Sequence, residues 1–161
     1  MASDMKSLWY YDYSICKVGI AEENGNISNV FFGTERNLAG YETAETALIK
    51  KAARQLTEYF GGKRKEFDLP LVLHGTDFQR SVWKALRSIP FGETRSYKDI
   101  AVIVGRPLAA RAIGMSNNRN PIAIIVPCHR VIGHNGSLVG YAGGLHLKKY
   151  LLDLEKVEYT L

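Results

Sequence analysis

The first half of the chain changes from a strand-like to a helix-like spacing of its apolar residues. Residues 8–32 are rich in aromatic and β-branched side chains, and the polar break at residues 22–26 has the turn residues of a hairpin. Between residues 44 and 60 the apolar positions recur every three or four residues, with Thr43 as the predicted N-cap and residues 61–62, both glycine, at the end. The pattern predicts a small antiparallel sheet followed by one amphipathic helix.

The second half is typical of short helices separated by strong helix stops. Thr76 begins a capping box, and the apolar stripe that follows it ends at Pro90. Ser96 is the predicted cap of the next helix, which breaks at Gly105 and resumes at Pro107 as its first residue. Two short helices around a glycine resemble a helix-turn-helix. By spacing alone, an ordinary corner between two helices with no DNA role explains the pattern better.

A third segment places a cysteine at the end of an apolar run. Residues 122–126 are typical of a buried strand that stops at Pro127, so we expect Cys128 just past a rigid strand end, where a reactive side chain is held in place. The glycine-rich segment 133–144 lets the backbone approach a ligand closely. The last helix is predicted to have Glu155 beside an apolar face formed by Leu147, Tyr150, Leu151 and Leu154.

The composition is that of an ordinary globular protein. Of 161 residues, 46% are hydrophobic and 23% are charged, and no apolar run approaches the ~20 residues needed to cross a bilayer. The start of the chain has no apolar signal segment, so we expect a protein of the cytoplasm, or of the nucleus in a eukaryote, without membrane contact. Cys16 and Cys128 are too few for a disulfide framework or a cysteine-based zinc site, and we expect free thiols.

The excess of basic residues lies in the second half of the chain. Residues 1–73 have nine Lys or Arg against ten Asp or Glu, a net charge of −1, whereas residues 74–161 have twelve against six, a net charge of +6. Such a block suits a polyanion, most simply a nucleic acid. A solvated basic face without a partner explains the same charge, so charge alone leaves both interpretations open.

The residues around Cys128 suggest nucleophilic chemistry. A buried cysteine is usually only a small hydrophobic side chain. Here His129 and Arg130 supply positive charge, which predicts a thiol pKa lowered from its usual ~8.5 and an available thiolate. If His129 accepts the thiol proton, its other ring nitrogen needs a partner, and Glu155 is a candidate. Glu155 could equally be a solvated charge near the end of the chain.

An ordered series of short motifs covers residues 67–155. It comprises Gly75-Thr76-Asp77-Phe78-Gln79, Val82-Trp83, Ile89-Pro90, Gly92-Glu93-Thr94, Ser96-Tyr97, Ile100-Ala101, Arg111-Ala112-Ile113-Gly114, Arg119-Asn120-Pro121, Pro127-Cys128-His129-Arg130-Val131 and Gly140-Tyr141-Ala142-Gly143-Gly144-Leu145. This series resembles the O6-alkylguanine-DNA alkyltransferase family, whereas residues 1–66 match only loosely in their layout. A related non-catalytic group has tryptophan in place of the reactive cysteine, and Cys128 argues against membership of that group.

The resemblance implies an α/β (α+β) fold of two domains. Residues 1–73 would form a small N-terminal ribonuclease H-like α/β domain. Residues 74–161 would form a helical DNA-binding and alkyl-acceptor domain with a winged-helix-like helix-turn-helix that enters the minor groove. The implied activity is direct-reversal DNA repair: irreversible, stoichiometric transfer of an alkyl (methyl) group from O6-alkylguanine in duplex DNA, after base flipping, to Cys128. O4-alkylthymine is a further candidate substrate.

The resemblance also implies roles for the catalytic residues. Cys128 would accept the alkyl group, His129 would act as base through a water, and Glu155 would orient His129. Asn120 would brace the active-site loop, and Tyr97 would donate a hydrogen bond toward the flipped guanine. A thiolate is a suitable nucleophile for an alkyl carbon, and because no ordinary active-site water cleaves the product thioether, each molecule would be consumed once.

DNA contacts follow from the same resemblance. Arg111 would fill the gap left by the flipped base, and the backbones of Cys128, Val131 and Ala142 would read the base edge. Further predicted substrate or DNA contacts are Ala109, Ala110, Ser116, Arg119, Arg130, Tyr141 and Lys148. Met115 and Ser116 are larger than the residues usual in the family at these positions. The expected partner is double-stranded DNA containing O6-alkylguanine, bound by a monomer, with cooperative binding along DNA left open.

No cofactor or metal is expected, because the sequence lacks the cysteine and histidine set with which some relatives bind zinc. Cys16 would then be structural. Two other classes of protein remain as alternatives. A Cys-His hydrolase would use the same thiolate with an oxyanion hole and multiple turnover. A non-catalytic helix-turn-helix DNA-binding protein would explain the charge but not the residues around Cys128.

Overall fold

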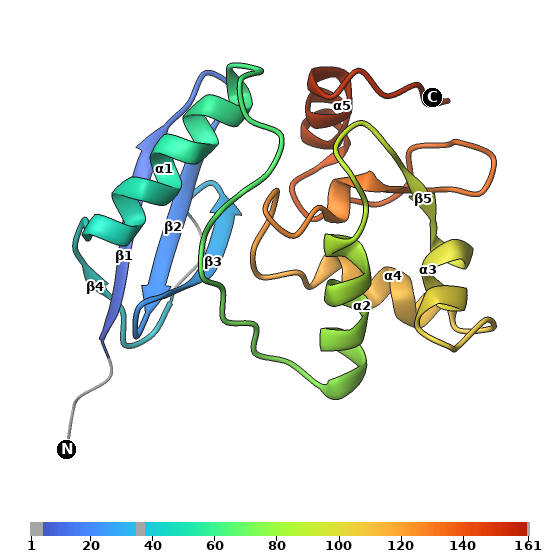
Figure 1. Ribbon diagram of the computed structural model, residues 1–161, viewed down its shortest axis with the longest axis horizontal. Helices are drawn as coiled ribbons and strands as arrows, with labels where there is room; N and C mark the ends of the chain where they lie inside the picture. The colour runs from blue at the N-terminus through green and yellow to red at the C-terminus, as the bar shows by residue number, and fades with distance from the viewer. Residues whose placement is uncertain (1–4, 35–37, 161) are drawn as a thin grey trace. The chain divides into compact units, whose positions relative to one another are not determined.

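The computed structural model describes residues 5–34 and 38–160 (Figure 1). These residues form two compact units that divide between Leu73 and His74. No helix in the described part of the chain is both long and apolar enough to cross a membrane.

The N-terminal unit is built on a four-stranded mixed sheet in the order β3-β2-β1-β4. The first three strands are antiparallel neighbours, and β4 pairs with β1 in parallel. Asn24 and Gly25 both have positive φ, 49° and 84°, in the turn between β2 and β3, which confirms the predicted hairpin. The strands are β1 (Lys6–Asp12), β2 (Lys17–Glu23), β3 (Asn26–Phe32) and β4 (Glu42–Thr43).

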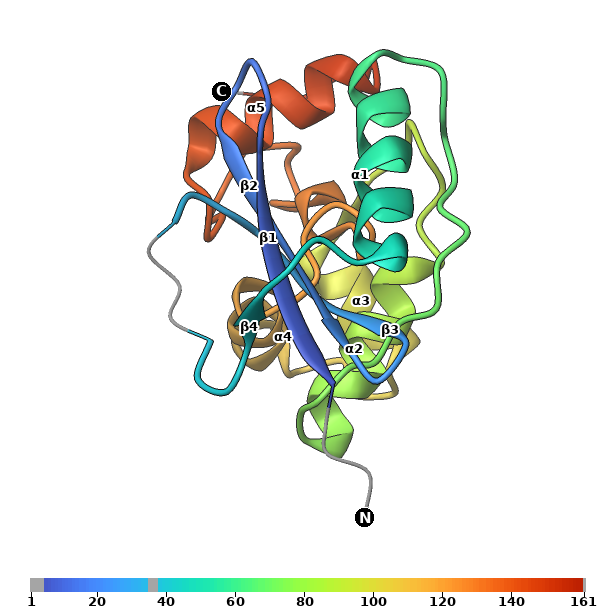
Figure 2. The same ribbon diagram turned by 90° about the vertical axis from the view of Figure 1, so that its left-hand side faces the viewer.

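Helix α1 (Ala47–Phe60) lies beside this sheet in both views (Figures 1 and 2). Its N-cap is Thr46, whose hydroxyl accepts a hydrogen bond from the Ile49 amide at 3.1 Å. The prediction that Thr43 caps this helix is wrong, because parallel pairing of Thr43 with Leu8 keeps residue 43 in an extended strand. The predicted end is confirmed by a C-cap at Gly61.

The C-terminal unit consists mainly of helices with one small parallel sheet between β5 and β6. The predicted caps Thr76 and Ser96 are both confirmed, and each belongs to a complete capping box, with Gln79 and with Asp99 respectively. The elements are α2 (Asp77–Arg87), β5 (Arg95–Ser96), α3 (Tyr97–Ile103), α4 (Ala110–Asn118), η1 (Cys128–Arg130), β6 (Val131–Ile132) and α5 (Leu145–Leu154).

The start of α4 differs from the prediction. Pro107 is not the first helical residue, because α4 begins at Ala110 with Ala109 as its N-cap. The end of α3 explains the difference. The Arg106 amide donates to the Ala101 carbonyl at 2.8 Å around Gly105, whose φ is 78°, and the Ala109 amide donates to the Arg106 carbonyl at 2.9 Å. The turn between the two helices therefore extends through residue 109.

The apolar run 122–126 is buried but is not a strand. It folds into tight turns in which the Ile125 amide donates to the Ala123 carbonyl at 2.8 Å and the Val126 amide donates to the Ile122 carbonyl at 3.0 Å. Ile124 has a φ of 71°, in the left-handed region. Burial was predicted correctly, but the strand was not. Cys128 consequently begins the short helix η1 instead of following a strand end.

Candidate active site

Cys128 is held by its backbone on both sides. Its amide donates to the Val126 carbonyl at 2.8 Å, and its own carbonyl accepts from Nδ2 of Asn117 at 3.2 Å. Only 5% of Cys128 is exposed. Asn117 itself is 1% exposed, on the buried side of α4. Asn117 could not be predicted from the sequence, since one polar residue at a buried helical position carries no signal of a contact eleven residues away.

Asn120 determines the shape of the loop before Cys128. Its Oδ1 accepts from the Ile122 amide at 3.0 Å and its Nδ2 donates to the Val126 carbonyl at 2.7 Å. One side chain thus replaces the backbone pairing that a strand would have needed. The side chain of Asn120 also acts to lower the pKa of the Cys128 thiol, so the same residue shapes the loop and influences the thiol.

Glu155, the C-cap residue of α5, joins His129 and Arg130 in one buried network. Nε2 of His129 lies 2.6 Å from Oε2 of Glu155, and Nε of Arg130 donates to Oε1 of Glu155 at 2.8 Å. The Gly92 amide donates to Oε1 of the same carboxylate at 3.1 Å, and Nη1 of Arg130 donates to the Ile89 carbonyl at 2.7 Å. Glu155 is therefore a buried, fully bonded group and not a solvated charge.

The electrostatics favour a neutral His129 and an ionised Glu155. Burial raises the pKa of Glu155, but its hydrogen bonds to His129 and Arg130 and the charge of the Arg130 guanidinium outweigh it and hold this pKa at about 2. Burial lowers the pKa of His129, against the raising effect of Glu155. A neutral His129 that donates from Nε2 leaves Nδ1 as an acceptor. Nδ1 is buried and has no hydrogen-bond partner within the described residues.

Lys148 is a buried cation beside the thiol. Its Nζ donates to the carbonyls of Val131 at 2.6 Å, Val139 at 2.8 Å and Gly140 at 3.1 Å. Burial lowers the pKa of Lys148 to about 8, while the charge of Cys128 acts to raise it. The predicted buried face of α5 needs a correction, because Lys148 and Leu152 are buried where Tyr150 and Leu154 were expected.

The protonation of Cys128 differs from the prediction. Burial raises the pKa of this thiol, although the side chains of Asn120 and Tyr141 and the charge of Lys148 act to lower it. The expected lowering by His129 and Arg130 is wrong, because His129 is neutral and the Arg130 guanidinium is bound to Glu155. The resting sulfur is therefore a thiol that needs a base.

Tyr97, the first residue of α3, lies at the same site. Its hydroxyl donates to the Val139 carbonyl at 3.1 Å, and Nζ of Lys148 lies 6.0 Å from its ring centroid. Burial, followed by the charge of Cys128, raises the pKa of Tyr97. The Val139 carbonyl therefore accepts from both Tyr97 and Lys148.

The other predicted contact residues divide into an exposed and a buried group. Those at the surface are Ala110, Arg111, Arg119 and Ala142, with Ala109 and Tyr141 half-buried. Ser116 is only 4% exposed, and its carbonyl accepts from Nε1 of Trp83 at 2.8 Å. Val131 is fully buried and its carbonyl accepts from Lys148. Arg130, a predicted DNA contact, is 6% exposed and its guanidinium is bound to Glu155 inside the unit, so this side chain does not lie at the surface as a DNA contact requires.

No group of three or more His, Cys, Asp or Glu side chains in residues 5–34 and 38–160 could hold a metal ion. Both cysteines are free.

The C-terminal unit has a buried Cys–His–Glu arrangement beside two short surface helices. These are the features of a protein that acts on DNA and accepts an alkyl group. Comparison with known proteins identifies the family. Residues 9–73 match the ribonuclease-like domain of 6-O-methylguanine DNA methyltransferase, and residues 77–157 match its DNA-binding domain. The chain therefore belongs to the 6-O-methylguanine DNA methyltransferase family, which confirms the resemblance and the expected α/β fold.

Individual relatives agree with this assignment. The methylated-DNA–protein-cysteine methyltransferase of Methanosarcina barkeri is 64% identical over 109 residues, covering 68% of this chain and 69% of the relative. The constitutive enzyme of the same description from Bacillus subtilis is 48% identical over 147 residues, covering 87% and 89%. The crystal structure of Mycobacterium tuberculosis OGT in complex with DNA superposes with a TM-score of 0.88 at 47% identity, covering 93% and 92%.

Proposed function

We propose that this protein repairs O6-alkylguanine in duplex DNA by transferring the alkyl group once and irreversibly to Sγ of Cys128. Membership of the methyltransferase family supports the reaction class. The single observation that carries the assignment of the acceptor is the geometry at Cys128. This buried thiol precedes a neutral histidine whose Nε2 is bound to Glu155 at 2.6 Å and whose Nδ1 is left as an acceptor.

The proposed reaction balances without a cofactor. Nδ1 of His129 takes the thiol proton through a water molecule, and the thiolate attacks the alkyl carbon. The bond between this carbon and O6 breaks, its electron pair stays on the purine, and the proton removed from the thiol finally resides on the restored guanine, which remains in the DNA strand. Glu155 stabilises the imidazolium that forms in between, and Lys148 stabilises the thiolate.

Tyr97 is proposed to assist the leaving base. Its hydroxyl donates to the Val139 carbonyl in the resting protein, and a flipped guanine would replace that carbonyl as acceptor. Lys148 keeps the Val139 carbonyl hydrogen-bonded when Tyr97 leaves it. Loss of the Tyr97 bond therefore leaves no unpaired backbone oxygen, and the exchange costs little.

The recognition of DNA is assigned to α3 and α4. Arg111 is exposed near the start of α4 and has small neighbours at Ala110 and Ala112, so its long side chain can reach into an opened base stack. We propose that α4 enters the minor groove as part of a monomer and that Arg111 occupies the place of the flipped base. The absence of acidic residues between Asp99 and Asp153 favours approach to phosphate.

Mass spectrometry tests the function directly. After incubation with duplex DNA that contains one O6-methylguanine, we expect one added methyl group, about 14 Da, on the peptide containing Cys128. Cys128→Ser should bind the same DNA without gaining mass, because neutral His129 cannot readily ionise a serine hydroxyl. Many repaired lesions per molecule, or transfer to the Cys128→Ser variant, would contradict the proposal. Multiple turnover of an ester would favour a Cys-His hydrolase instead.

A further inference from the structure

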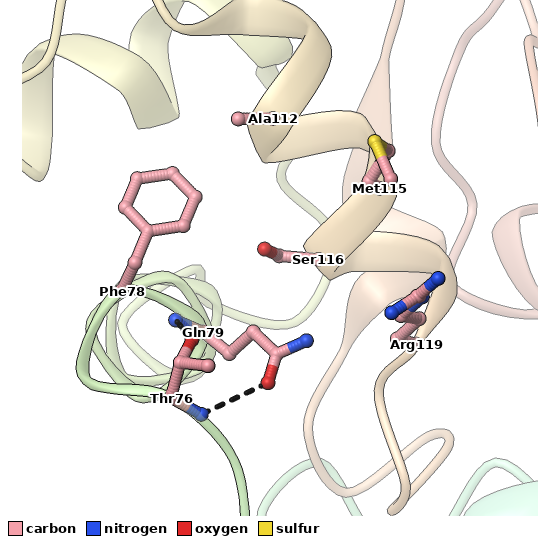
Figure 3. Close-up of a pocket in the computed structure, with 7 residues that line it drawn as sticks. All are labelled: Thr76, Phe78, Gln79, Ala112, Met115, Ser116 and Arg119. Carbon is pink, nitrogen blue, oxygen red and sulfur yellow. Dashed lines mark hydrogen bonds between the residues drawn. The ribbon is translucent and has the colours of Figure 1, made fainter.

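A shallow cavity lies within the C-terminal unit where the beginning of α2 meets α4 (Figure 3). Its volume of about 180 Å³ is smaller than the pockets that usually hold a drug-sized ligand, which measure ~300–1,000 Å³. Phe78, Ala112 and Met115 give it an apolar lining, whereas Thr76, Gln79 and Arg119 place polar groups around it. A ligand that fits would be small and partly apolar, with a negative charge beside it.

Met115 is one of several exposed large apolar residues in the C-terminal unit, where Val102 and Ile103 of α3 are 58% and 55% exposed. Met115 itself is 60% exposed, whereas its neighbour Ser116 is 4% exposed and Ile113 is fully buried. Leu108, in the turn before α4, is 99% exposed. Packing within the chain therefore does not account for Met115. Apolar side chains that lie together at a surface, as Phe78, Ala112 and Met115 do around the cavity, mark sites of interaction.

The position of Met115 on α4 connects it to the proposed DNA contact. Arg111, Met115 and the C-cap residue Arg119 are spaced four residues apart, so they follow one side of α4 to its end. At 1.5 Å per residue, Met115 lies ~6 Å along the helix from each arginine. If Arg111 enters the base stack, Met115 falls within reach of a neighbouring nucleotide.

The charge around the cavity fits a polyanion. Residues 100–152 contain no Asp or Glu. The Arg106 guanidinium lies 5.7 Å from the centroid of the Phe78 ring, and Arg119 is exposed at the other side of the cavity. A DNA strand presents an apolar sugar face and a charged phosphate side by side, which matches this combination.

We infer that the cavity formed by Phe78, Ala112 and Met115 binds a deoxyribose of a DNA strand, while Arg119 lies at the adjacent phosphate. The inference rests on the proposed function, since it places the strand that carries or faces the damaged base. The apolar contact releases no counterion, so its share of the affinity is independent of salt. Met115 then strengthens the binding of duplex DNA without taking part in the chemistry.

The test compares Met115→Ala with Met5→Ala, which removes the same atoms from an exposed methionine of the N-terminal unit. Binding of a short duplex with one O6-methylguanine is measured at several salt concentrations. We expect Met115→Ala to raise Kd about fivefold to tenfold at every concentration, with an unchanged slope of log K against log salt. Met5→Ala should match the wild type, and Met115→Leu should keep most of the affinity.

Reaction with free O6-benzylguanine separates this inference from the proposed function. We expect the same rate in all four proteins, because this substrate needs no strand contact. Wild-type affinity in Met115→Ala, or a changed salt slope, would overturn the deoxyribose contact alone. A wild-type protein that fails to bind the duplex or to accept its methyl group would overturn the proposed function and this inference together. A melting curve of each variant confirms that it is folded.

Discussion

Glu155 connects three separate segments of the C-terminal unit, because its carboxylate accepts hydrogen bonds from His129, from Arg130 and from the Gly92 amide. Removing its charge would leave the buried Arg130 guanidinium without its anion, and breaking a buried pair from one side is strongly destabilising. The same carboxylate would lose its ability to stabilise an imidazolium at His129. One side chain is therefore needed for both the fold and the proton transfer.

Replacing Glu155 by Gln tests this double role. We expect the free energy of unfolding at pH 7 to fall by about 3 kcal/mol, and methyl transfer to slow even at temperatures where the variant is fully folded. The pKa of Glu155 in the folded protein, about 2, is below its ordinary value of 4.5. Its stabilisation is therefore complete above pH 4.5 and is lost as the pH falls toward 2, so urea titrations should show a steeper acid loss for the wild type than for Glu155→Gln.

Lys148 and burial have opposite effects on the pKa of the Cys128 thiol. Burial raises the pKa of Cys128, and the charge of Lys148 acts to lower it. We expect Lys148→Met to move the pH profile of Cys128 alkylation by iodoacetamide to higher pH. Lys149→Met is the matched control, since Lys149 is exposed on the same helix. An unshifted profile in folded Lys148→Met would mean that the cation only anchors the three carbonyls.

At the scale of elements, the caps and turns decide where each helix begins. The capping box at Thr76 and the cap at Ser96 could be predicted because each depends on residues within four positions of one another. Thr43 and Thr46 could not be distinguished from sequence, since pairing of β4 with a distant strand excludes residue 43 from the helix. The turns of residues 122–126 were missed for a similar reason: burial is common to strands and turns, and the side chain of Asn120 decides between them.

The same substitution, Thr to Ala, at positions 46 and 43 tests which residue caps α1. Thr46→Ala removes the hydrogen bond from the Ile49 amide and the bond that the Thr46 hydroxyl donates to Glu22 at 2.6 Å. We expect it to lower the free energy of unfolding by about 1–2 kcal/mol. Thr43→Ala changes an exposed residue in a two-residue strand and should stay within about 0.5 kcal/mol of the wild type. Equal losses in urea unfolding would contradict the assignment of the cap.

In the whole molecule, the basic residues and the residues with proposed functions lie in the same unit. The C-terminal unit contains the excess of basic residues, the acceptor cysteine and every residue proposed to touch DNA, whereas the N-terminal unit has a net charge near zero. The motifs around Cys128 were visible in the sequence because they are contiguous. The hydrogen bonds of Arg130 and Lys148 could not be predicted from the sequence, because they depend on how η1 packs against α5 and the loop at residues 139–140.

The role proposed for Arg111 involves the whole molecule, since it joins DNA binding to the chemistry at Cys128. Arg111→Ala should slow methyl transfer from duplex DNA much more than reaction with free O6-benzylguanine, because only the duplex requires a base to be held out of the stack. Arg119→Ala, at the C-cap of the same helix, is the matched control. Arg119→Ala should reduce the slope of log K against log salt concentration by about one, as expected for a lost phosphate contact. Excess protein should restore the rate of this variant on duplex DNA. Excess protein should not restore the rate of Arg111→Ala, because loss of this side chain raises the free energy of base flipping, a step that follows binding. Single-turnover rates at fixed salt measure both effects, and equal losses of Arg111→Ala on the two substrates would assign Arg111 to the chemical site or the fold.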